Sequence, residues 1–226
     1  MALPSDPPRT PPTTGSLEDA AQYSGGKTTR IEIRGEGLPV LLAPGAGAGS
    51  DHPFMTGMRD RLVAAGFRVA TFDYPYHAEG RRAPDRFERL VECHHAVYER
   101  VGALAGNAPF LVGKSMGGRI GSHLAVPAPG RVFLGYPLVA MGKQTPRDVS
   151  HLAGLGPMLF VQGERDAMAP LALIQTVVAG LEAATLEVVP DADHGFRVPR
   201  RTGIDAAAML DHIGSIVASW MRSRRR

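Results

Sequence analysis

The sequence predicts an α/β domain with a mostly parallel sheet of about seven strands and helices on both faces. Three observations indicate this class. From about residue 28 onward, short apolar runs alternate with segments of helical periodicity, which is the pattern of strands joined by crossover helices. Most of the expected strands are continuously apolar, as strands covered on both faces should be. No insertion between them is long enough to form a lid domain.

The expected strands and helices follow in order along the chain. A first strand at 29–34 alternates in character and should lie towards an edge of the sheet. Buried strands are expected at 40–43, 68–73, 110–112, 131–135, 157–162 and 185–189. Helices are expected between them at about 53–65, 84–105, 116–125, 170–181 and 203–221.

The helix at 84–105 shows the periodicity most clearly. Apolar residues recur at spacings of three and four and form one stripe that must face the sheet. This stripe consists of Leu90, His94, Val97, Val101 and Leu104. We therefore expect His94 to be a core residue.

Both ends of the chain differ in composition from the rest. Residues 1–26 are rich in Pro, Thr, Ser and Gly and are predicted to be a disordered leader. The net charge of +3 depends on four arginines within 222–226, without which it is −1. We interpret 222–226 as a solvated basic tail and expect no nucleic-acid partner. One domain is therefore expected over 27–221.

The apolar runs and the cysteine count also indicate where in the cell the protein is expected. No apolar run approaches the roughly 20 residues that span a bilayer, so no membrane partner is expected. The one cysteine, Cys93, cannot form an internal disulfide, which favours a reducing, cytoplasmic location.

The strongest motif is Gly-Lys-Ser-Met-Gly at 113–117, directly after the strand at 110–112 and directly before a helix. A nucleophile elbow needs this order of strand, abrupt turn and helix, because the serine must be held in a strained conformation at the top of the sheet. Glycines at the crowded positions, with Gly118 as a third, remove side chains that would collide. The sequence therefore predicts Ser115 as the nucleophile of an α/β-hydrolase fold.

A serine nucleophile needs a general base and an orienting acid, which follow it in the order acid, then histidine, in this fold. The strand at 157–162 is followed by Glu164 and Asp166, and the strand at 185–189 is followed by His194. These positions lie at the carboxyl ends of strands, where open α/β sheets bind ligands. We predict His194 as the base and favour Asp166 over Glu164 as the acid.

The glycine-rich segment 41–50 predicts an oxyanion hole. Its backbone N–H groups can point into the site, and we assign the donors to Ala46 and Met116. An alternative is a dinucleotide-binding unit ending in Asp73. That unit would place its third glycine at Ser50, and Asp73 lies further along than the expected spacing of roughly 20 residues.

Further residues could line the pocket, because they follow strands at the same sheet edge. These candidate substrate-binding residues are Gly45, Gly47, His52, His77, Arg81 and Arg82. Basic side chains there would concentrate anionic substrates.

No metal or organic cofactor is expected. The run Cys93-His94-His95 is not a metal site, because adjacent helical residues point about 100° apart and cannot converge on one ion.

Several segments together are similar to a small α/β-hydrolase family of the testis-expressed-protein-like type. This family is related to dienelactone hydrolases and has distant relatives that include a chromatin-complex subunit. The segments are 41–50 (LLAPGAGAGS), 51–55 (DHPFM), 72–76 (FDYPY), 79–84 (EGRRAP), 113–119 (GKSMGGR), 135–138 (GYPL) and 160–166 (FVQGERD). The resemblance covers roughly residues 38–200 and implies a hydrolase domain with Ser115, Asp166 and His194 in the positions of the triad.

We therefore expect a serine hydrolase that cleaves an ester or thioester of a small molecule through an acyl-enzyme. The alternative is a non-catalytic interaction module on a hydrolase scaffold, because fold alone does not establish catalysis.

Overall fold

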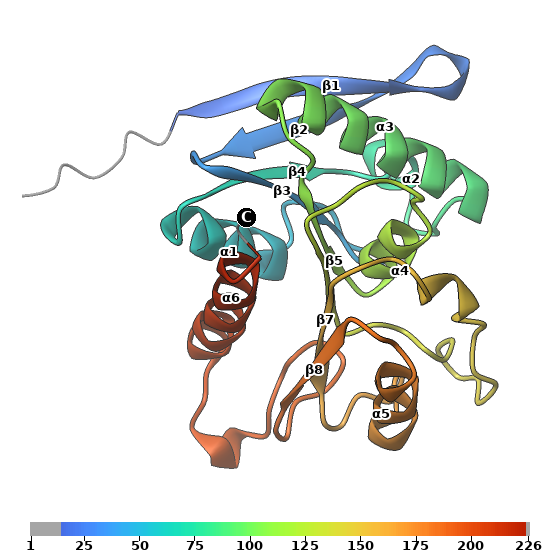
Figure 1. The fold of residues 1–226 in the computed structure, drawn as a ribbon, viewed down its shortest axis with the longest axis vertical. Coiled ribbons are helices and arrows are strands. Elements are labelled where there is room, and N and C mark those ends of the chain that lie inside the picture. The colour runs from blue at the N-terminus through green and yellow to red at the C-terminus, as the bar shows by residue number, and fades with distance from the viewer. Residues whose placement is uncertain (1–14, 225–226) are drawn as a thin grey trace, which may run out of the picture.

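The computed structural model describes residues 15–224 (Figure 1). Its centre is one eight-stranded sheet in the order β1-β2-β4-β3-β5-β6-β7-β8. β1 pairs antiparallel with β2, and β2 pairs antiparallel with β4, while the other pairs are parallel. The strands are β1 (Ser16–Tyr23), β2 (Lys27–Arg34), β3 (Leu38–Ala43), β4 (Phe67–Phe72), β5 (Phe110–Lys114), β6 (Arg131–Leu134), β7 (Met158–Gly163) and β8 (Ala184–Val189). The predicted mostly parallel α/β architecture is confirmed.

Helices cover both faces of the sheet. They are α1 (Pro53–Ala64), α2 (Pro75–Ala78), α3 (Phe87–Ala105), α4 (Met116–Ser122), α5 (Leu171–Ala179) and α6 (Ala206–Arg222), with 3-10 turns at Ser24–Gly26, Ser150–Leu152 and Arg200–Thr202. Figure 1 shows α1 and α6 on one side of the sheet and α3, α4 and α5 on the other. No helix within 15–224 is long and apolar enough to cross a membrane.

The sheet separates three apolar clusters, one beneath α1 and α6 and two on the other face, beneath α3 and α4 and beneath α5. Successive side chains of a strand point to opposite faces, so Val40 and Leu42 of β3 pack with α1 and α6, while Leu41 and Ala43 pack with α3. All four side chains are fully buried. β3 and β5 are therefore central strands that are packed on both faces of the sheet.

Helix α3 packs through the predicted stripe. Its residue His94 is 1% exposed, and Nδ1 lies 2.9 Å from the Tyr74 hydroxyl. Burial lowers the pKa of His94 to about 3, so the imidazole is neutral. The neighbouring Cys93 thiol is also buried, and burial raises its pKa to about 12. His94 is thus the core residue that the periodicity predicts.

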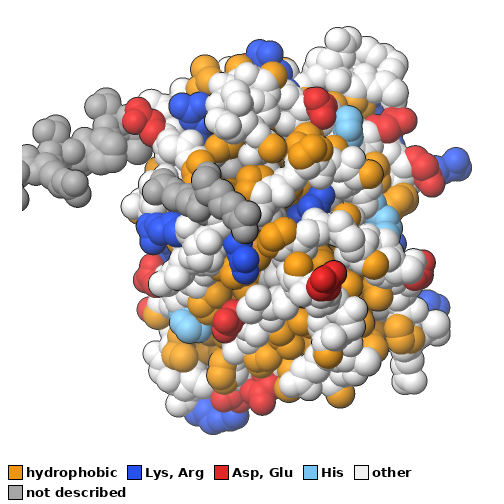
Figure 2. Space-filling model, viewed as in Figure 1, with side chains coloured by type: hydrophobic (Ala, Val, Ile, Leu, Met, Phe, Trp, Pro, Cys, Tyr) orange, Lys and Arg blue, Asp and Glu red, His pale blue; other side chains and the backbone are white. Residues whose placement is uncertain are grey.

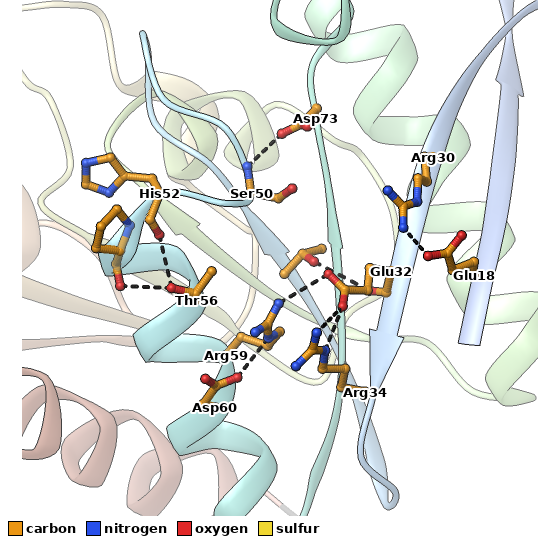
Figure 3. Close-up of polar contacts among 12 residues, drawn as sticks. Glu18, Arg30, Glu32, Arg34, Ser50, His52, Thr56, Arg59, Asp60 and Asp73 are labelled. Atoms are coloured by element: carbon orange, nitrogen blue, oxygen red, sulfur yellow. Dashed lines mark hydrogen bonds and ion pairs between the residues drawn. The ribbon is translucent and has the colours of Figure 1, made fainter. Parts of the chain in front are cut away.

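A charged contact ties α1 to the sheet. The guanidinium of Arg59, almost fully buried, donates to Glu32 of β2 at 3.2 Å and to Asp60 at 2.9 Å (Figure 3). A buried charge is costly unless it is paired, and Arg59 is paired on two sides.

The prediction that residues 1–26 form a disordered leader is wrong for residues 16–26. These residues form β1 and a turn with Gly25 and Gly26 at positive φ, and β1 pairs along its full length with β2. Asp19 accepts two bonds from Arg100 of α3, at 2.9 and 2.8 Å. β1 is an exposed edge strand, so it lacks the apolar run by which strands are recognised, and it makes the sheet one strand larger than expected. The rest of the predicted leader, 1–14, lies outside the described residues.

The predicted start of the basic tail, at residue 222, lies too early in the chain. Arg222 belongs to α6, donates to the carbonyl of Ala65 at 2.7 Å and lies over the ring of Phe67. It therefore docks the end of α6 rather than extending into solvent. Arg225 and Arg226 lie outside the described residues.

Candidate active site

The turn between β5 and α4 has the strained geometry of a nucleophile elbow. Ser115 has φ 48° and ψ −113°, values that an L-residue adopts only when its surroundings enforce them. A Cβ on Gly117 would lie 2.5 Å from the carbonyl oxygens of Ala43 and Pro44, and one on Gly113 would overlap the backbone nitrogen of Gly118. The crowding predicted from the glycine spacing is therefore present.

Three side chains from three loops form a hydrogen-bonded chain. His194 Nε2 lies 2.8 Å from Ser115 Oγ, and His194 Nδ1 lies 2.7 Å from Asp166 Oδ2. An ionised carboxylate only accepts, so Nδ1 carries the proton and Nε2 is free to accept the serine proton. This is the arrangement in which an imidazole can activate a hydroxyl.

The Asp166 side chain is buried, and both of its carboxylate oxygens accept hydrogen bonds. Its side chain is inaccessible to solvent, and it also accepts from the Gln162 amide and from the Met168 N–H, the latter at 2.7 Å. Burial alone would raise the pKa of Asp166, but the bond from His194 and the other donors outweigh it and lower that pKa below its ordinary value. The carboxylate is therefore charged and orients the imidazole.

Glu164, the competing acid, lies elsewhere. It is exposed, and its carboxylate accepts from the Asp191 N–H at 2.8 Å. It therefore braces the loop that carries His194 and makes no bond to the imidazole.

The loop after β3 lies against the elbow. A Cβ on Gly45 would lie 3.7 Å from Ser115 Cβ. Within the described chain, the Ala46 and Met116 N–H groups have no hydrogen-bond acceptor, whereas the Gly47 N–H donates to the Tyr76 hydroxyl at 3.1 Å. Ala46 and Met116 therefore retain the free donors that an oxyanion hole requires.

Two residues that brace this loop were missed by sequence reasoning as parts of the site. The Tyr76 hydroxyl bridges the turn at Gly47, and Asp73 accepts the Ser50 N–H at 2.6 Å (Figure 3). Both residues belong to the segment 72–76 of the family resemblance, and Asp73 also enters the alternative dinucleotide-binding unit, but neither is assigned a role at the site. The available signal is their position within four residues of the carboxyl end of β4, at the same sheet edge as Ser115.

The predicted histidines have local structural contacts. His52 caps α1, where Nδ1 accepts from the Phe54 N–H at 3.2 Å. The His77 ring packs onto Gly49, so that a Cβ at residue 49 would overlap it, and Nδ1 lies 3.7 Å from Asp73. Neither imidazole contacts Ser115 or His194.

The predicted basic residues do not gather at the elbow. Arg81 pairs with Glu79 at 2.6 Å and with Asp85 at 2.7 Å. Arg82 is exposed and forms no ion pair with any described residue. Figure 2 shows acidic and basic side chains interspersed on the face it presents. The expected excess of positive charge is thus partly neutralised by neighbouring carboxylates.

A cavity of about 480 Å³ adjoins the histidine loop. It lies between the start of α1, the residues after His194 and the start of α6, and its lining includes His52, Phe54, Gly195, Phe196, Met209 and Leu210. A larger cavity of about 600 Å³ is lined by Leu38 and Phe110, at the amino ends of β3 and β5. Ligands of open α/β sheets bind at the carboxyl ends, and the smaller cavity lies at that end, next to the loop of His194, with neither Ser115 nor His194 in its lining.

A family model described as an alpha/beta hydrolase domain matches residues 37–222. The chain belongs to the alpha/beta hydrolase family. This membership agrees with the hydrolase part of the resemblance found in the sequence.

Solved structures show the same hydrolase fold at low sequence identity. A serine hydrolase without a lid from Xanthomonas campestris is 20% identical with a TM-score of 0.67, over 93% of this chain and 97% of that one. Est1E from Butyrivibrio proteoclasticus, with ferulic acid bound, is 13% identical with a TM-score of 0.75, over 91% and 98%. A dienelactone hydrolase from Anabaena variabilis is 15% identical with a TM-score of 0.69, over 94% and 99%.

Proposed function

We propose that this alpha/beta hydrolase is a serine hydrolase that cleaves an ester or thioester of a small molecule through an acyl-enzyme. The observation that carries the proposal is the unbroken chain from Ser115 Oγ through His194 to Asp166, with contacts of 2.8 and 2.7 Å. The strained backbone of Ser115 supports it, because such strain at a partly exposed hydroxyl is typical of a nucleophile.

In the proposed reaction, Ser115 Oγ attacks the substrate carbonyl carbon while its proton passes to His194 Nε2. The carbonyl oxygen gains negative charge, which the N–H groups of Ala46 and Met116 stabilise. Collapse of the tetrahedral intermediate expels the alcohol or thiol, which takes the proton from His194. Water then attacks the acyl-serine by the same route, and Asp166 fixes the imidazole throughout.

The absence of a long insertion between the strands supports a small substrate. The cavity beside the histidine loop is bounded by aromatic and apolar side chains, among them Phe54, Phe196 and Met209, and could accept an uncharged part of such a substrate. Est1E with ferulic acid bound and the dienelactone hydrolase support an ester substrate by similarity of fold only. Kinship with the testis-expressed-protein-like type and a cytoplasmic location are part of the same proposal.

The test is reaction with a fluorophosphonate probe, which labels an activated serine. Wild-type protein should be labelled, and Ser115→Ala should not be, although it keeps the wild-type melting temperature. Hydrolysis of a panel of acyl esters and thioesters then identifies the preferred group. An unlabelled but folded wild-type protein would instead favour the non-catalytic interaction module.

A further inference from the structure

Lys114 is a partly buried amine with no role in the steps above. It is the last residue of β5 and directly precedes Ser115. Its Nζ donates to the backbone carbonyl of His194 at 2.7 Å. The ammonium lies against a stacked pair of aromatic rings, 5.8 Å from the centre of Phe54 and 5.3 Å from that of Phe196, whose centres are themselves 5.8 Å apart.

The loop that Lys114 contacts is itself strained. Asp191 and Phe196, on either side of His194, have φ values of 56° and 61°. Strain of this kind persists only where surrounding contacts enforce it. The Glu164 carboxylate accepts a hydrogen bond from the Asp191 N–H, and the Asp193 carboxylate accepts from the N–H groups of Gly195 and Arg197. Within residues 15–224, Lys114 alone donates to the carbonyl of His194.

The burial of Lys114 has an energetic cost that packing does not require. Burial lowers the pKa of Lys114 to about 8, although Asp166 and Asp193 act in the opposite direction. An apolar side chain of similar length could occupy the same space beside the rings without desolvating a charge. The amine therefore contributes more than packing volume. Its one hydrogen bond, to the carbonyl of His194, indicates that this contribution is made at the histidine loop.

We propose that Lys114 is a positioning residue that fixes the histidine loop relative to the nucleophile, through its bond to the His194 carbonyl. This inference rests on the proposed serine-hydrolase function. Two adjacent residues then hold His194 at two points, Lys114 at the backbone and Ser115 at Nε2. The close approach of Gly135 completes the fit, since a Cβ there would lie 3.2 Å from Lys114 Nζ and 3.5 Å from His194 Cε1.

The expected consequence concerns rate more than binding. A misplacement of a catalytic group by about 1 Å can cost about 100-fold in rate. Lys114→Met keeps an unbranched side chain that can pack against the stacked rings of Phe54 and Phe196 but donates no hydrogen bond. We expect it to lower kcat by about 10- to 100-fold while KM changes little.

Three variants separate positioning from packing. Lys114→Gln lacks the charge but keeps an N–H donor, so it should recover part of the rate lost in Lys114→Met. Lys27→Met is the matched control, because Lys27 is an exposed lysine on β2 with one contact, to Glu79 at 3.7 Å. It should have wild-type kinetics.

The measurements are kcat and KM for a p-nitrophenyl ester, the rate of fluorophosphonate labelling, and the far-downfield proton resonance of the His194–Asp166 bond. Lower kcat and slower labelling in folded Lys114→Met, with a weakened resonance, support the proposal. Equal kinetics for wild type and Lys114→Met would overturn it, as would equal losses in the Met and Gln variants. If Lys114→Met does not fold, Lys114→Gln must still lose rate and weaken the resonance. Absence of labelling in the wild type would instead refute the proposed function.

Discussion

Replacement of Asp166 by asparagine tests the orienting acid with almost no change in shape. The carboxylate now accepts three bonds, from His194 and Gln162 at one oxygen and from Met168 at the other. An amide has one accepting oxygen and one donating nitrogen, so at least one donor must face another donor. Where the amide nitrogen faces His194, that pairing is restored only if the imidazole adopts its other tautomer, in which Nε2 carries the proton and cannot accept that of Ser115.

The magnitude follows from what is lost. The asparagine leaves a buried donor unsatisfied, which costs about 1–3 kcal/mol, and removes the negative charge that stabilises the imidazolium. Loss of the corresponding acid in serine hydrolases lowers kcat by about 10,000-fold, equivalent to about 5.4 kcal/mol at 1.36 kcal/mol per tenfold. We expect a loss of this order in Asp166→Asn.

The assay is kcat for a p-nitrophenyl ester, with melting temperatures to confirm folding. Glu164→Gln is the matched control, because this exposed side chain makes one bond, to the Asp191 N–H, which an amide oxygen can still accept. It should change kcat little. A larger loss in Glu164→Gln than in Asp166→Asn would transfer the role of the acid to Glu164 and refute the reasoning.

Two further predictions concern stability. Gly117→Ala should prevent stable folding of the elbow, because its Cβ would lie 2.5 Å from backbone oxygens of β3 and the following residue. The control, Gly102→Ala in α3, has no neighbour closer than 3.8 Å and should be neutral or stabilising by up to about 1 kcal/mol. Chemical denaturation gives the free energy of unfolding of both variants, and equal values would contradict the prediction. His94, whose pKa falls from 6.5 to about 3 on folding, remains neutral while the unfolded chain takes up a proton, so stability should fall as pH falls from about 6.5 to 3, by up to about 1.4 kcal/mol per pH unit. His94→Gln should show a shallower decline in unfolding free energy over that window, and an unchanged slope would exclude His94 as its source.

The elements predicted well from sequence are those with strong local signals. The elbow was identified because its glycines are spaced as the crowding of β5 and α4 requires, and those contacts are present at Gly113 and Gly117. Asp166 and His194 were located because parallel strands place their carboxyl ends at one edge. The sequence favours Asp166 over Glu164, although both follow the same strand, and in the structure the hydrogen bond to the imidazole is made by Asp166.

The elements missed have signals that depend on tertiary contacts. β1 is an exposed edge strand with Ala21 as its only fully buried residue, so neither its composition nor its periodicity distinguishes it from a linker. Tyr76 and Lys114 act through bonds to distant backbone groups, at Gly47 and His194. Sequence distance conceals such pairs, and no local pattern predicts them. The substrate-binding roles of His52 and His77 remain predictions, because His52 lines the cavity beside the histidine loop while the His77 ring lies against Gly49.

The burial of Cys93 makes the protein convenient for site-directed labelling. The chain has one cysteine, its thiol is inaccessible, and its pKa of about 12 leaves almost no thiolate at neutral pH. Maleimide and disulfide reagents should therefore leave the native protein unmodified. A cysteine introduced on the histidine loop or beside the cavity would be the one reactive thiol, and a fluorophore or spin label attached there would report on substrate entry without removing a natural residue first.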